Sequence, residues 1–367
     1  MRILIAPDKF AGTMSAAEAA DAVADGWRRA RPDDTTVTLP LADGGPGFVE
    51  VLEHALPSGV LHHVRASDPL GRPTWGHYLR DGATAYIESA HACGLHHLTA
   101  AERDPRRTTS YALGLIMAHA IEHGARRLVI GLGGSATNDA GAGMLTALGC
   151  VLRDTDGDPV PYGGEGPGLT AILEWLPRTR GVEIIAATDV DNPLLGPEGA
   201  TYVFGPQKGA TDRDLLVLEA SLARFAEVAQ RDLDLPGLAD LPGAGAAGGI
   251  GFALFLLGGR RESGARLTCD AVGLDAAVAE ADLVITGEGS FDAQSLRGKL
   301  AAEVAAAAAA HSTPCLVLAG RSDLAEHPGL AGVHSVADHV GGTAAAMAAP
   351  VEGLSALAAR VATEWHE

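Results

Sequence analysis

Several loops of this chain combine carboxylates, lysines and glycines directly after short apolar runs. Asp8 and Lys9 follow the first of these runs, and Asp43 precedes a pair of glycines. Carboxylates hold Mg²⁺ or transfer protons, whereas lysines and glycine-rich backbone bind phosphate groups. Loops that follow parallel strands gather at one edge of the sheet, where open α/β folds bind their ligands. We therefore expect a site for a phosphate-bearing ligand and its cation.

The segment 128–144 organises the centre of the chain, because an apolar run leads through a glycine-rich loop into a helix-like stretch. Glycine has no Cβ, so backbone N–H groups in such a loop can approach an anion closely at the start of the helix. A phosphate cradle is the leading interpretation, and a plain tight turn is the alternative. The polar side chains of the loop favour the cradle. Its candidate ligand-binding residues are Gly133, Gly134, Ser135, Thr137 and Asn138.

A second glycine-rich loop follows the apolar run 281–286 and leads into an alanine-rich helix. Its end is similar to a Walker A loop, but Ala293 stands where that motif has glycine, and Leu300 where it has serine or threonine. The loop is therefore not a P-loop. Its candidate residues are Gly287, Glu288, Asp292, Gln294 and Lys299.

The predicted buried strand 184–188 ends in two aspartates, Asp189 and Asp191. In an extended segment both project to the same side, where they could hold a metal, or a metal and a proton. An Asx-type turn before Pro193 is the alternative, and it would use only one of them. In the segment 204–209, Lys208 either meets phosphate or lies exposed on the surface.

A dinucleotide-binding fold is the main competing interpretation. Gly131, Gly133 and Ala136 satisfy G-x-G-x-x-A, and Asp154 lies near the spacing of a ribose-binding acid. Against it, Asp139 would crowd a pyrophosphate in the first turn of the helix unless a cation intervened. A Mg²⁺-nucleotide accounts for this residue better than NAD does.

The elements that position these residues alternate between strand and helix. The pattern predicts a strand at 2–7, a helix at 15–30 with Ser15 and Glu18 as its capping box, a strand at 35–39 and a helix at 48–56. This order predicts a parallel sheet with right-handed crossovers. From residue 60 to 90, short β-like runs separated by turn signals indicate that a hairpin-rich second domain begins.

Composition excludes several classes of protein. With 367 residues, the chain exceeds the size of one core, so two domains are expected. A formal charge of −19 without a basic patch argues against a nucleic-acid partner. The four cysteines are scattered, which favours reduced thiols over disulfides or zinc. No apolar stretch reaches the roughly 20 residues that span a bilayer, so we expect a cytoplasmic protein without a membrane partner.

Seven stretches resemble, in the same order, those of the bacterial glycerate kinases of the first type. They are IAPDKFAGTMSA, LADGGPG, GLGGSATNDAGAGM, ATDVDNPLLGPEGA, FGPQKGA, PGAGAAGG and DLVITGEGSFDAQSLRGK. The resemblance implies a two-domain α/β fold unrelated to P-loop kinases. A Rossmann-like domain with a parallel sheet would be formed by both chain ends, 1–66 and 285–367, and an α/β domain, 67–284, would be inserted between them. A monomer or homodimer is expected.

The resemblance also implies an activity, the transfer of the γ-phosphoryl group of ATP to D-glycerate with Mg²⁺, which usually gives 2-phosphoglycerate. Asp189 would orient or deprotonate the glycerate hydroxyl, and Asp43 and Asp292 would hold Mg²⁺, although these roles could be exchanged. Asp8 and Lys9 would belong to the catalytic group. Lys299 and the loop 133–138 would take phosphate or the glycerate carboxylate. Three alternatives remain open: 3-phosphoglycerate as the product, an NAD-dependent oxidoreductase, and a non-catalytic nucleotide-binding protein.

Two positions depart from the family pattern. The family commonly has Pro-Asp-Ser-Phe-Lys-Gly where this chain has Pro-Asp-Lys-Phe-Ala-Gly, so the lysine moves from position 11 to Lys9. A shift of two residues in an extended loop keeps the ammonium group on the same side. The usual Gly-Glu-Gly-Arg becomes Gly-Glu-Gly-Ser at Ser290, and Arg297 or Arg321 could replace the missing guanidinium.

Overall fold

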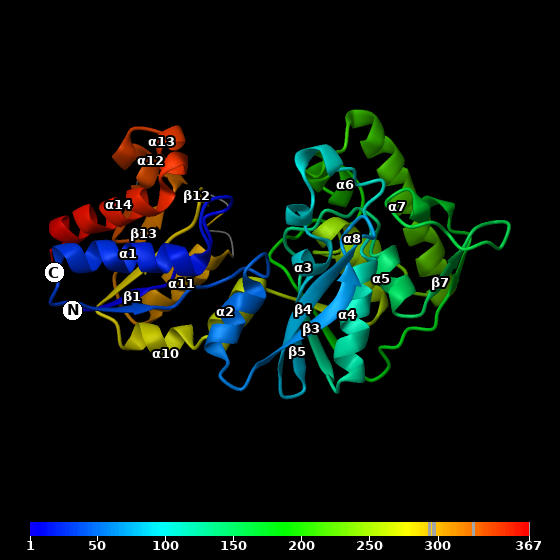
Figure 1. Cartoon of the computed structure of the whole chain (residues 1–367), viewed down its shortest axis with the longest axis horizontal. Helices are drawn as coiled ribbons and strands as arrows, with labels where there is room; N and C mark the ends of the chain where they lie inside the picture. The colour runs from blue at the N-terminus through cyan, green and yellow to red at the C-terminus, as the bar shows by residue number, and fades with distance from the viewer. Residues whose placement is uncertain (293–294, 296–298, 325–326, 367) are drawn as a thin grey trace. The chain divides into compact units, whose positions relative to one another are not determined.

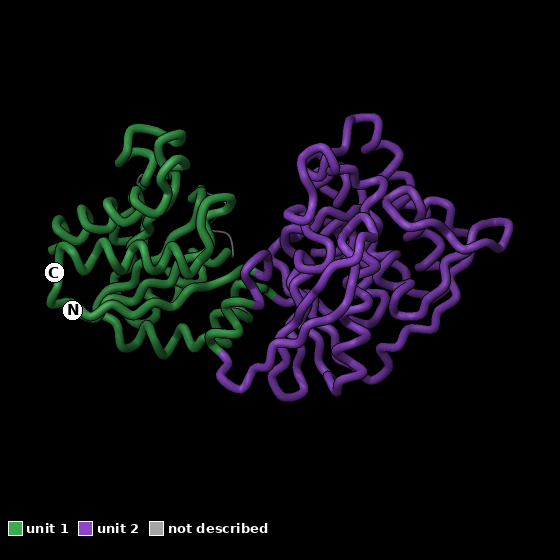
Figure 2. The backbone as a smooth tube through the Cα atoms, viewed as in Figure 1, with its two compact units in different colours: residues 1–43, 50–55, 263–367 green, residues 44–49, 56–262 purple. Residues whose placement is uncertain are grey.

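The computed structural model describes residues 1–292, 295, 299–324 and 327–366 (Figure 1). The chain divides into two compact units (Figure 2). Unit 1 contains residues 1–43, 50–55 and 263–367, and unit 2 contains residues 44–49 and 56–262. Both ends of the chain therefore belong to unit 1.

The main changes of unit lie at 55/56 and 262/263, whereas the sequence analysis places the domain boundaries at 66/67 and 284/285. Strand β3 (Val60–Ser67) belongs to unit 2 because its whole length pairs with β4 (Pro73–Asp81). Helices α9 (Gly264–Ala271) and α10 (Leu274–Ala279) belong to unit 1 because they pack on its core. The sequence pattern predicts that one domain is inserted into the other, but it does not predict which unit β3, α9 and α10 join.

Unit 1 is built on a parallel sheet of five strands in the order β15-β13-β11-β1-β2. The strands are β1 (Arg2–Ile5), β2 (Thr35–Thr38), β11 (Leu283–Thr286), β13 (Cys315–Ala319) and β15 (Gly332–Ser335). Strand β1 pairs with β2 on one side and with β11 on the other. The predicted parallel sheet formed by both chain ends is confirmed.

Helices cover both faces of this sheet (Figure 1). Side chains alternate along β1, so Ile3 and Ile5 face one core and Leu4 faces the other. The first core is closed by α1 (Ala16–Ala30) and α14 (Pro350–Glu364). The second is closed by α9, α10 and α11 (Leu300–Ala310). Short elements complete the unit: β12 (Ser290–Phe291), β14 (Arg321–Ser322), α12 (Val336–Val340) and α13 (Thr343–Ala348).

Helix α1 begins as its sequence predicts. The Ser15 hydroxyl accepts a hydrogen bond from the Glu18 N–H at 3.2 Å, and the Glu18 carboxylate accepts one from the Ser15 N–H at 2.8 Å. This reciprocal pair satisfies two backbone donors that the helix itself leaves unpaired. The capping box is therefore confirmed.

Unit 2 contains a mixed sheet of six strands in the order β10-β9-β6-β5-β4-β3. Besides β3 and β4, its strands are β5 (Thr84–Glu88), β6 (Arg127–Gly131), β9 (Glu183–Ala187) and β10 (Arg260–Glu262). Strands β3, β4 and β5 are antiparallel, as the hairpin signals predict, and the others are parallel. A separate hairpin joins β7 (Val151–Arg153) to β8 (Ile172–Glu174).

The helices of unit 2 pack around one large core. They are α3 (Ser89–Cys93), α4 (Tyr111–Glu122), α5 (Ala142–Ala147), α6 (Ala200–Phe204), α7 (Asp212–Leu233) and α8 (Ala246–Leu256). Helix α2 (Phe48–Ala55) lies where the chain changes unit. All four cysteines are buried thiols. Within the described ranges, every helix is too short or too polar to cross a membrane.

The close packing of α1 on α14 depends on Gly26. A Cβ at this position would lie 2.1 Å from the Ser355 carbonyl oxygen and 2.9 Å from the Ala358 Cβ. Although alanine has the higher helix propensity, we expect Gly26→Ala to lower the free energy of unfolding by about 1–3 kcal/mol through overpacking. Denaturant unfolding would measure the change. Asp21→Ala on the exposed side of α1 is the control, expected within about 0.5 kcal/mol of wild type. Equal stability of Gly26→Ala and wild type would contradict the packing described.

Candidate active site

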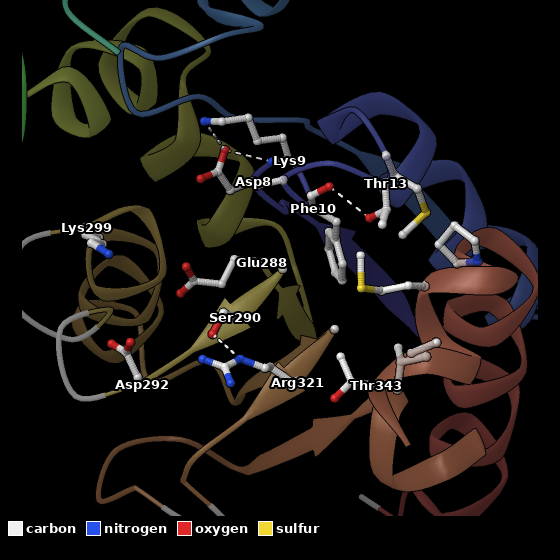
Figure 3. A pocket seen from close by; sticks show the side chains of 18 of the residues that line it. Asp8, Lys9, Phe10, Thr13, Glu288, Ser290, Asp292, Lys299, Arg321 and Thr343 are labelled. Atoms are coloured by element: carbon white, nitrogen blue, oxygen red, sulfur yellow. Dashed lines mark hydrogen bonds and ion pairs between the residues drawn. The ribbon is translucent and has the colours of Figure 1, made fainter. Parts of the chain in front are cut away.

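A pocket of about 530 Å³ lies in unit 1 at the carboxyl ends of the central strands (Figure 3). The loop after β1 and the loop after β11 form two of its walls and are joined by a hydrogen bond of 2.8 Å from the Asp8 N–H to the Gly287 carbonyl. The charged side chains that line it are Asp8, Lys9, Asp43, Glu288, Asp292, Lys299 and Arg321. Six of these seven are predicted site residues from three separate stretches of the sequence.

Lys9 links the two aspartates of the N-terminal loops. Its Nζ lies 2.8 Å from Asp43 Oδ1 and 3.5 Å from Asp8 Oδ1. Burial by itself would lower the pKa of Lys9, but the two carboxylates outweigh it and raise that pKa above its ordinary value. Lys9 is therefore a permanent cation in the pocket.

Asp8 has the opposite character. Burial, reinforced by the charge of Asp43, raises the pKa of Asp8 to about 7, although Lys9 acts against the shift. A carboxyl group with this pKa changes its charge near neutral pH, as a proton-transferring group must. Asp8 is thus the carboxyl group of the pocket best suited to exchange a proton.

Glu288 supplies a carboxylate oxygen that needs a partner. Its Oε1 is buried and accepts no hydrogen bond from the described residues. Burial raises the pKa of Glu288. Leaving a buried carboxylate oxygen unpaired costs free energy, so this atom fits a bound cation or hydroxyl group. The preceding Gly287 has a packing role, because a Cβ there would lie 2.1 Å from the Leu318 carbonyl oxygen.

Asp292 and Lys299 lie in the pocket wall on either side of a turn. Asp292 Oδ1 accepts a hydrogen bond of 3.2 Å from the Ser295 N–H, and the Ser295 hydroxyl accepts one of 3.1 Å from the Asp292 N–H. Lys299 immediately precedes α11. Gln294 and Arg297, both named from the sequence, lie outside the described residues.

The guanidinium missing at position 290 has a counterpart in the neighbouring strand. Strands β12 and β14 pair in parallel, with Ser290 opposite Arg321. The Arg321 Nε donates a hydrogen bond of 2.9 Å to the Ser290 hydroxyl (Figure 3). Arg321, one of the two arginines considered from the sequence, lines this pocket, and the other, Arg297, lies outside the described residues.

The donor set of the pocket fits Mg²⁺ that arrives with phosphate groups. Among the described residues, no three carboxylate, histidine or cysteine side chains are grouped closely enough to form a metal cage. Mg²⁺ is commonly bound by one or two carboxylates together with substrate phosphates and water. Four carboxylates and three cationic side chains line the pocket, so a divalent cation would offset the excess negative charge.

The glycine-rich loop of unit 2 turns its polar side chains inward. Thr137 and Asn138 have no exposed surface, and Ser135 is 4% exposed. Asn138 Nδ2 donates to Thr201 Oγ1 at 3.2 Å, while its Oδ1 is buried without a partner among the described residues. Gly133 and Gly134 are the more accessible candidates in this loop.

The helix that follows this loop already has an anion at its N-terminus. The buried Asp139 carboxylate accepts hydrogen bonds from the N–H groups of Gly141, Gly143 and Ser110 and from the Ser110 hydroxyl, at 2.8–3.3 Å. These bonds use the N–H groups that the phosphate-cradle interpretation assigns to a ligand at the start of α5. At this helix start the interpretation is wrong, because the chain supplies its own carboxylate.

Lys208 is buried rather than exposed. With 2% of its surface accessible, its Nζ donates to the Thr137 carbonyl at 2.7 Å and to the Ser135 hydroxyl at 3.4 Å. Burial lowers the pKa of Lys208 to about 8. The exposed-lysine alternative is therefore wrong, and Lys208 holds the glycine-rich loop from within. The local sequence around Lys208, with a proline and glycines nearby, contains no pattern that predicts this burial.

The two aspartates after β9 have different surroundings. Asp191 is 77% exposed and forms an ion pair of 2.7 Å with Arg261 Nη2. The same guanidinium donates through Nε to the Thr188 carbonyl at 3.2 Å. Asp189 is half-buried, two residues beyond the end of β9. Asp189 is therefore the more enclosed of the two carboxylates and the better candidate.

A profile of the glycerate kinase family matches residues 3–366. The chain belongs to the glycerate kinase family. It is 42% identical over 327 residues to the protein named Glycerate 2-kinase of Escherichia coli (strain K12), covering 87% of this chain and 85% of that protein. It is 43% identical over 326 residues to the protein named Glycerate kinase of Bacillus subtilis (strain 168), covering 87% and 85%.

A solved structure extends the comparison to the fold. The crystal structure of a glycerate kinase 2 from Salmonella typhimurium LT2 superposes with a TM-score of 0.81 at 40% identity. The match covers 99% of this chain and 98% of that one. Both the resemblance stated from the sequence motifs and the α/β fold it implied are confirmed.

Membership of the glycerate kinase family leaves the dinucleotide interpretation without support. Asp154, its proposed ribose-binding acid, accepts hydrogen bonds of 2.9 Å from the N–H groups of Asp156 and Asp158. It therefore stabilises its own turn after β7.

The raised pKa of Asp8 predicts a pH-dependent stability. The fold raises the pKa of Asp8 from 3.8 to about 7. The native state therefore favours the protonated carboxyl, and this contribution to the free energy of unfolding is fully present below pH 3.8. It is lost as the pH rises through about 7. The Asp8→Asn variant stays neutral. We expect its Tm to approach that of wild type near pH 4 and to exceed it near pH 8, measured by calorimetry.

Glu18→Gln is a control of opposite sign. Hydrogen bonds from Ser15 lower the pKa of Glu18, so its contribution is present at neutral pH and is lost as the pH falls. Glu18→Gln should melt below wild type near pH 8. A Tm difference between Asp8→Asn and wild type that stayed constant from pH 4 to 8 would contradict the shift described for Asp8.

Proposed function

We propose that this protein transfers the γ-phosphoryl group of ATP to the C2 hydroxyl of D-glycerate, with Mg²⁺, giving ADP and 2-phosphoglycerate. The observation that carries the proposal is the near full-length relationship to the Escherichia coli protein named Glycerate 2-kinase. The pocket of unit 1 supports it, because carboxylates and cations of the kinds that phosphoryl transfer uses line this pocket. A kinase of this kind needs little covalent chemistry from its side chains.

In unit 1, we assign Asp43 and Asp292 to Mg²⁺, which when bound neutralises charge on the phosphate oxygens. Lys9 fixes the Asp43 carboxylate at 2.8 Å and keeps its own positive charge in the pocket. Lys299 offers a second ammonium group for phosphate. We keep Asp8 in the catalytic group, because its raised pKa of about 7 lets it change charge near neutral pH.

In unit 2, we assign Asp189 to the glycerate hydroxyl, which it orients or deprotonates. The support is its half-buried position just beyond the end of strand β9, whereas its neighbour Asp191 is 77% exposed. The accessible backbone at Gly133 and Gly134 is assigned to an anionic group of a substrate. Lys208 acts behind this loop, where its bond to the Thr137 carbonyl fixes the backbone.

The reaction itself is the first test of this proposal. Purified protein with Mg·ATP should release ADP in the presence of D-glycerate, at a much higher rate than with L-glycerate. Coupling the product to enolase without a mutase should give a signal, since enolase accepts the 2-phospho isomer only. ADP release without an enolase signal would move the product to 3-phosphoglycerate. No ADP with any short hydroxy acid would overturn the kinase proposal, and tight ATP binding would then indicate a non-catalytic nucleotide-binding protein.

The role of Asp189 can be separated from that of its neighbour. Asparagine keeps the shape of the side chain and removes the charge, so we expect Asp189→Asn to lower kcat by roughly 10²- to 10⁴-fold. Asp191→Asn is the matched control, because it loses only an exposed ion pair worth about 0–1 kcal/mol, and its kcat should stay near wild type. Steady-state kinetics over a range of Mg²⁺ concentrations, with Tm as the measure of folding, would compare the two.

The Mg²⁺ dependence decides between two roles for Asp189. A loss of kcat that excess Mg²⁺ does not restore supports the base. A loss that excess Mg²⁺ rescues would assign Asp189 to the metal instead. An active Asp189→Asn variant beside an inactive Asp191→Asn variant would show that the wrong carboxylate has been chosen.

A further inference from the structure

The pocket of unit 1 is larger than a three-carbon acid requires. Its volume of about 530 Å³ lies within the roughly 300–1,000 Å³ of pockets that bury drug-sized ligands. Glycerate would leave most of this space empty. The size suits a substrate that has both a ring system and a chain of charged groups.

The sheet order points to the same place. In the order β2-β1-β11-β13-β15, connections leave β1 and β11 in opposite directions along the sheet. Open α/β sheets bind ligands in the crevice at such a switch point, outside the carboxyl ends of the two strands. The loops that carry Asp8 and Glu288 leave β1 and β11 at this point, so the pocket occupies the crevice.

One side of the pocket is apolar. Phe10 and Met14 form it from the loop after β1, and Ala346, Met347 and Pro350 form it from α13 and the start of α14. Met347 is 62% exposed, so its side chain is available to a ligand in the pocket. A flat, uncharged ring would bury this surface.

The cations of the polar side are not equivalent. Lys9 is paired with Asp43 and Asp8, and the charge of Lys299 acts on Glu288. Arg321 contacts the neutral Ser290 hydroxyl through Nε, and within the described residues it forms no ion pair and its two Nη groups have no hydrogen-bond partner. A guanidinium held at one nitrogen with its terminal nitrogens available is suited to bidentate binding of phosphate.

We propose that this pocket binds the nucleoside triphosphate, with the base against Met14, Ala346 and Met347 and the phosphates at Arg321. The Ser290 hydroxyl orients the guanidinium of Arg321. Arg321, which lies in β14, then makes the phosphate contact. This inference rests on the proposed kinase activity and assigns to the pocket one of its two substrates.

Binding of the non-hydrolysable analogue AMP-PNP with Mg²⁺ tests the phosphate contact. Arg321→Gln removes the charge and keeps a side chain able to donate to Ser290. We expect it to raise the Kd of AMP-PNP, and of inorganic tripolyphosphate, by roughly 10- to 100-fold in titration calorimetry. Arg28→Gln, an exposed arginine of α1 outside the pocket, should leave both affinities unchanged.

Two variants of α13 test the base. Ala346→Phe fills the apolar side and should weaken AMP-PNP without affecting tripolyphosphate, whereas Ala344→Phe, on the same helix but outside the pocket, should change neither. Met347→Ala removes an exposed side chain, so the variant should fold normally, and it should weaken AMP-PNP alone.

The kinetic readout separates the two substrates. Under this proposal Arg321→Gln and Met347→Ala raise the KM for ATP and leave the KM for D-glycerate unchanged. Unchanged AMP-PNP affinity in both variants, with a raised KM for D-glycerate, would overturn the assignment and place the acid in this pocket. If AMP-PNP binds wild type and is lost in the variants while no phosphoglycerate forms, the nucleotide site is supported and the proposed reaction is the part that fails.

Discussion

The pairing of β1 with β11 is the constraint on which the candidate site depends. Three hydrogen bonds tie these strands and their loops across about 280 positions of sequence, from the Ala6 N–H to the Ile285 carbonyl at 2.8 Å, from the Thr286 hydroxyl to the Ala6 carbonyl at 2.9 Å, and from the Asp8 N–H to the Gly287 carbonyl at 2.8 Å. A register change of one residue would turn the alternating side chains to the wrong faces and displace both loops. The parallel ladder thus determines which carboxylates meet.

Acidity is the second constraint. Four carboxylates in one pocket repel one another. The ammonium group of Lys9 reduces this repulsion, because it lies between the carboxylates of Asp8 and Asp43. The remaining strain is visible in the raised pKa of Asp8 and in the unpaired oxygen of Glu288. Groups of this kind reduce stability in the free protein and are retained where a ligand compensates for them. In the glycine-rich loop of unit 2, by contrast, Asp139 and Asn138 have no exposed surface.

The sequence predicts the helices and strands better than it predicts the side-chain contacts between distant segments. Ser15 and Glu18 act through neighbouring backbone, so a local pattern suffices to predict their capping box. Asp8, Asp43, Glu288 and Asp292 line one pocket because they follow parallel strands that share one edge of the sheet. The burial of Lys208, the bonds from Ser110 to Asp139 and the hydrogen bond from Arg321 to Ser290 join segments that are distant in sequence, so no local spacing predicts them. The roles of Asp189 and of the metal-binding candidates stay predictions.

Because both ends of the chain build unit 1, this unit cannot complete its fold until the C-terminal segment has been synthesised. Strand β1 leaves the ribosome first, yet its central partner β11 follows only after the 207 residues of 56–262, which at ordinary elongation rates takes on the order of tens of seconds. During that interval the buried face of α1, with Val23 and Trp27, has no α14 to cover it. Unit 2 is almost continuous in sequence and has its own core, so it can fold while the N-terminal segment waits. During synthesis, the order of the segments along the chain therefore leaves apolar surface of unit 1 uncovered, where chaperones can bind it or other chains can aggregate with it.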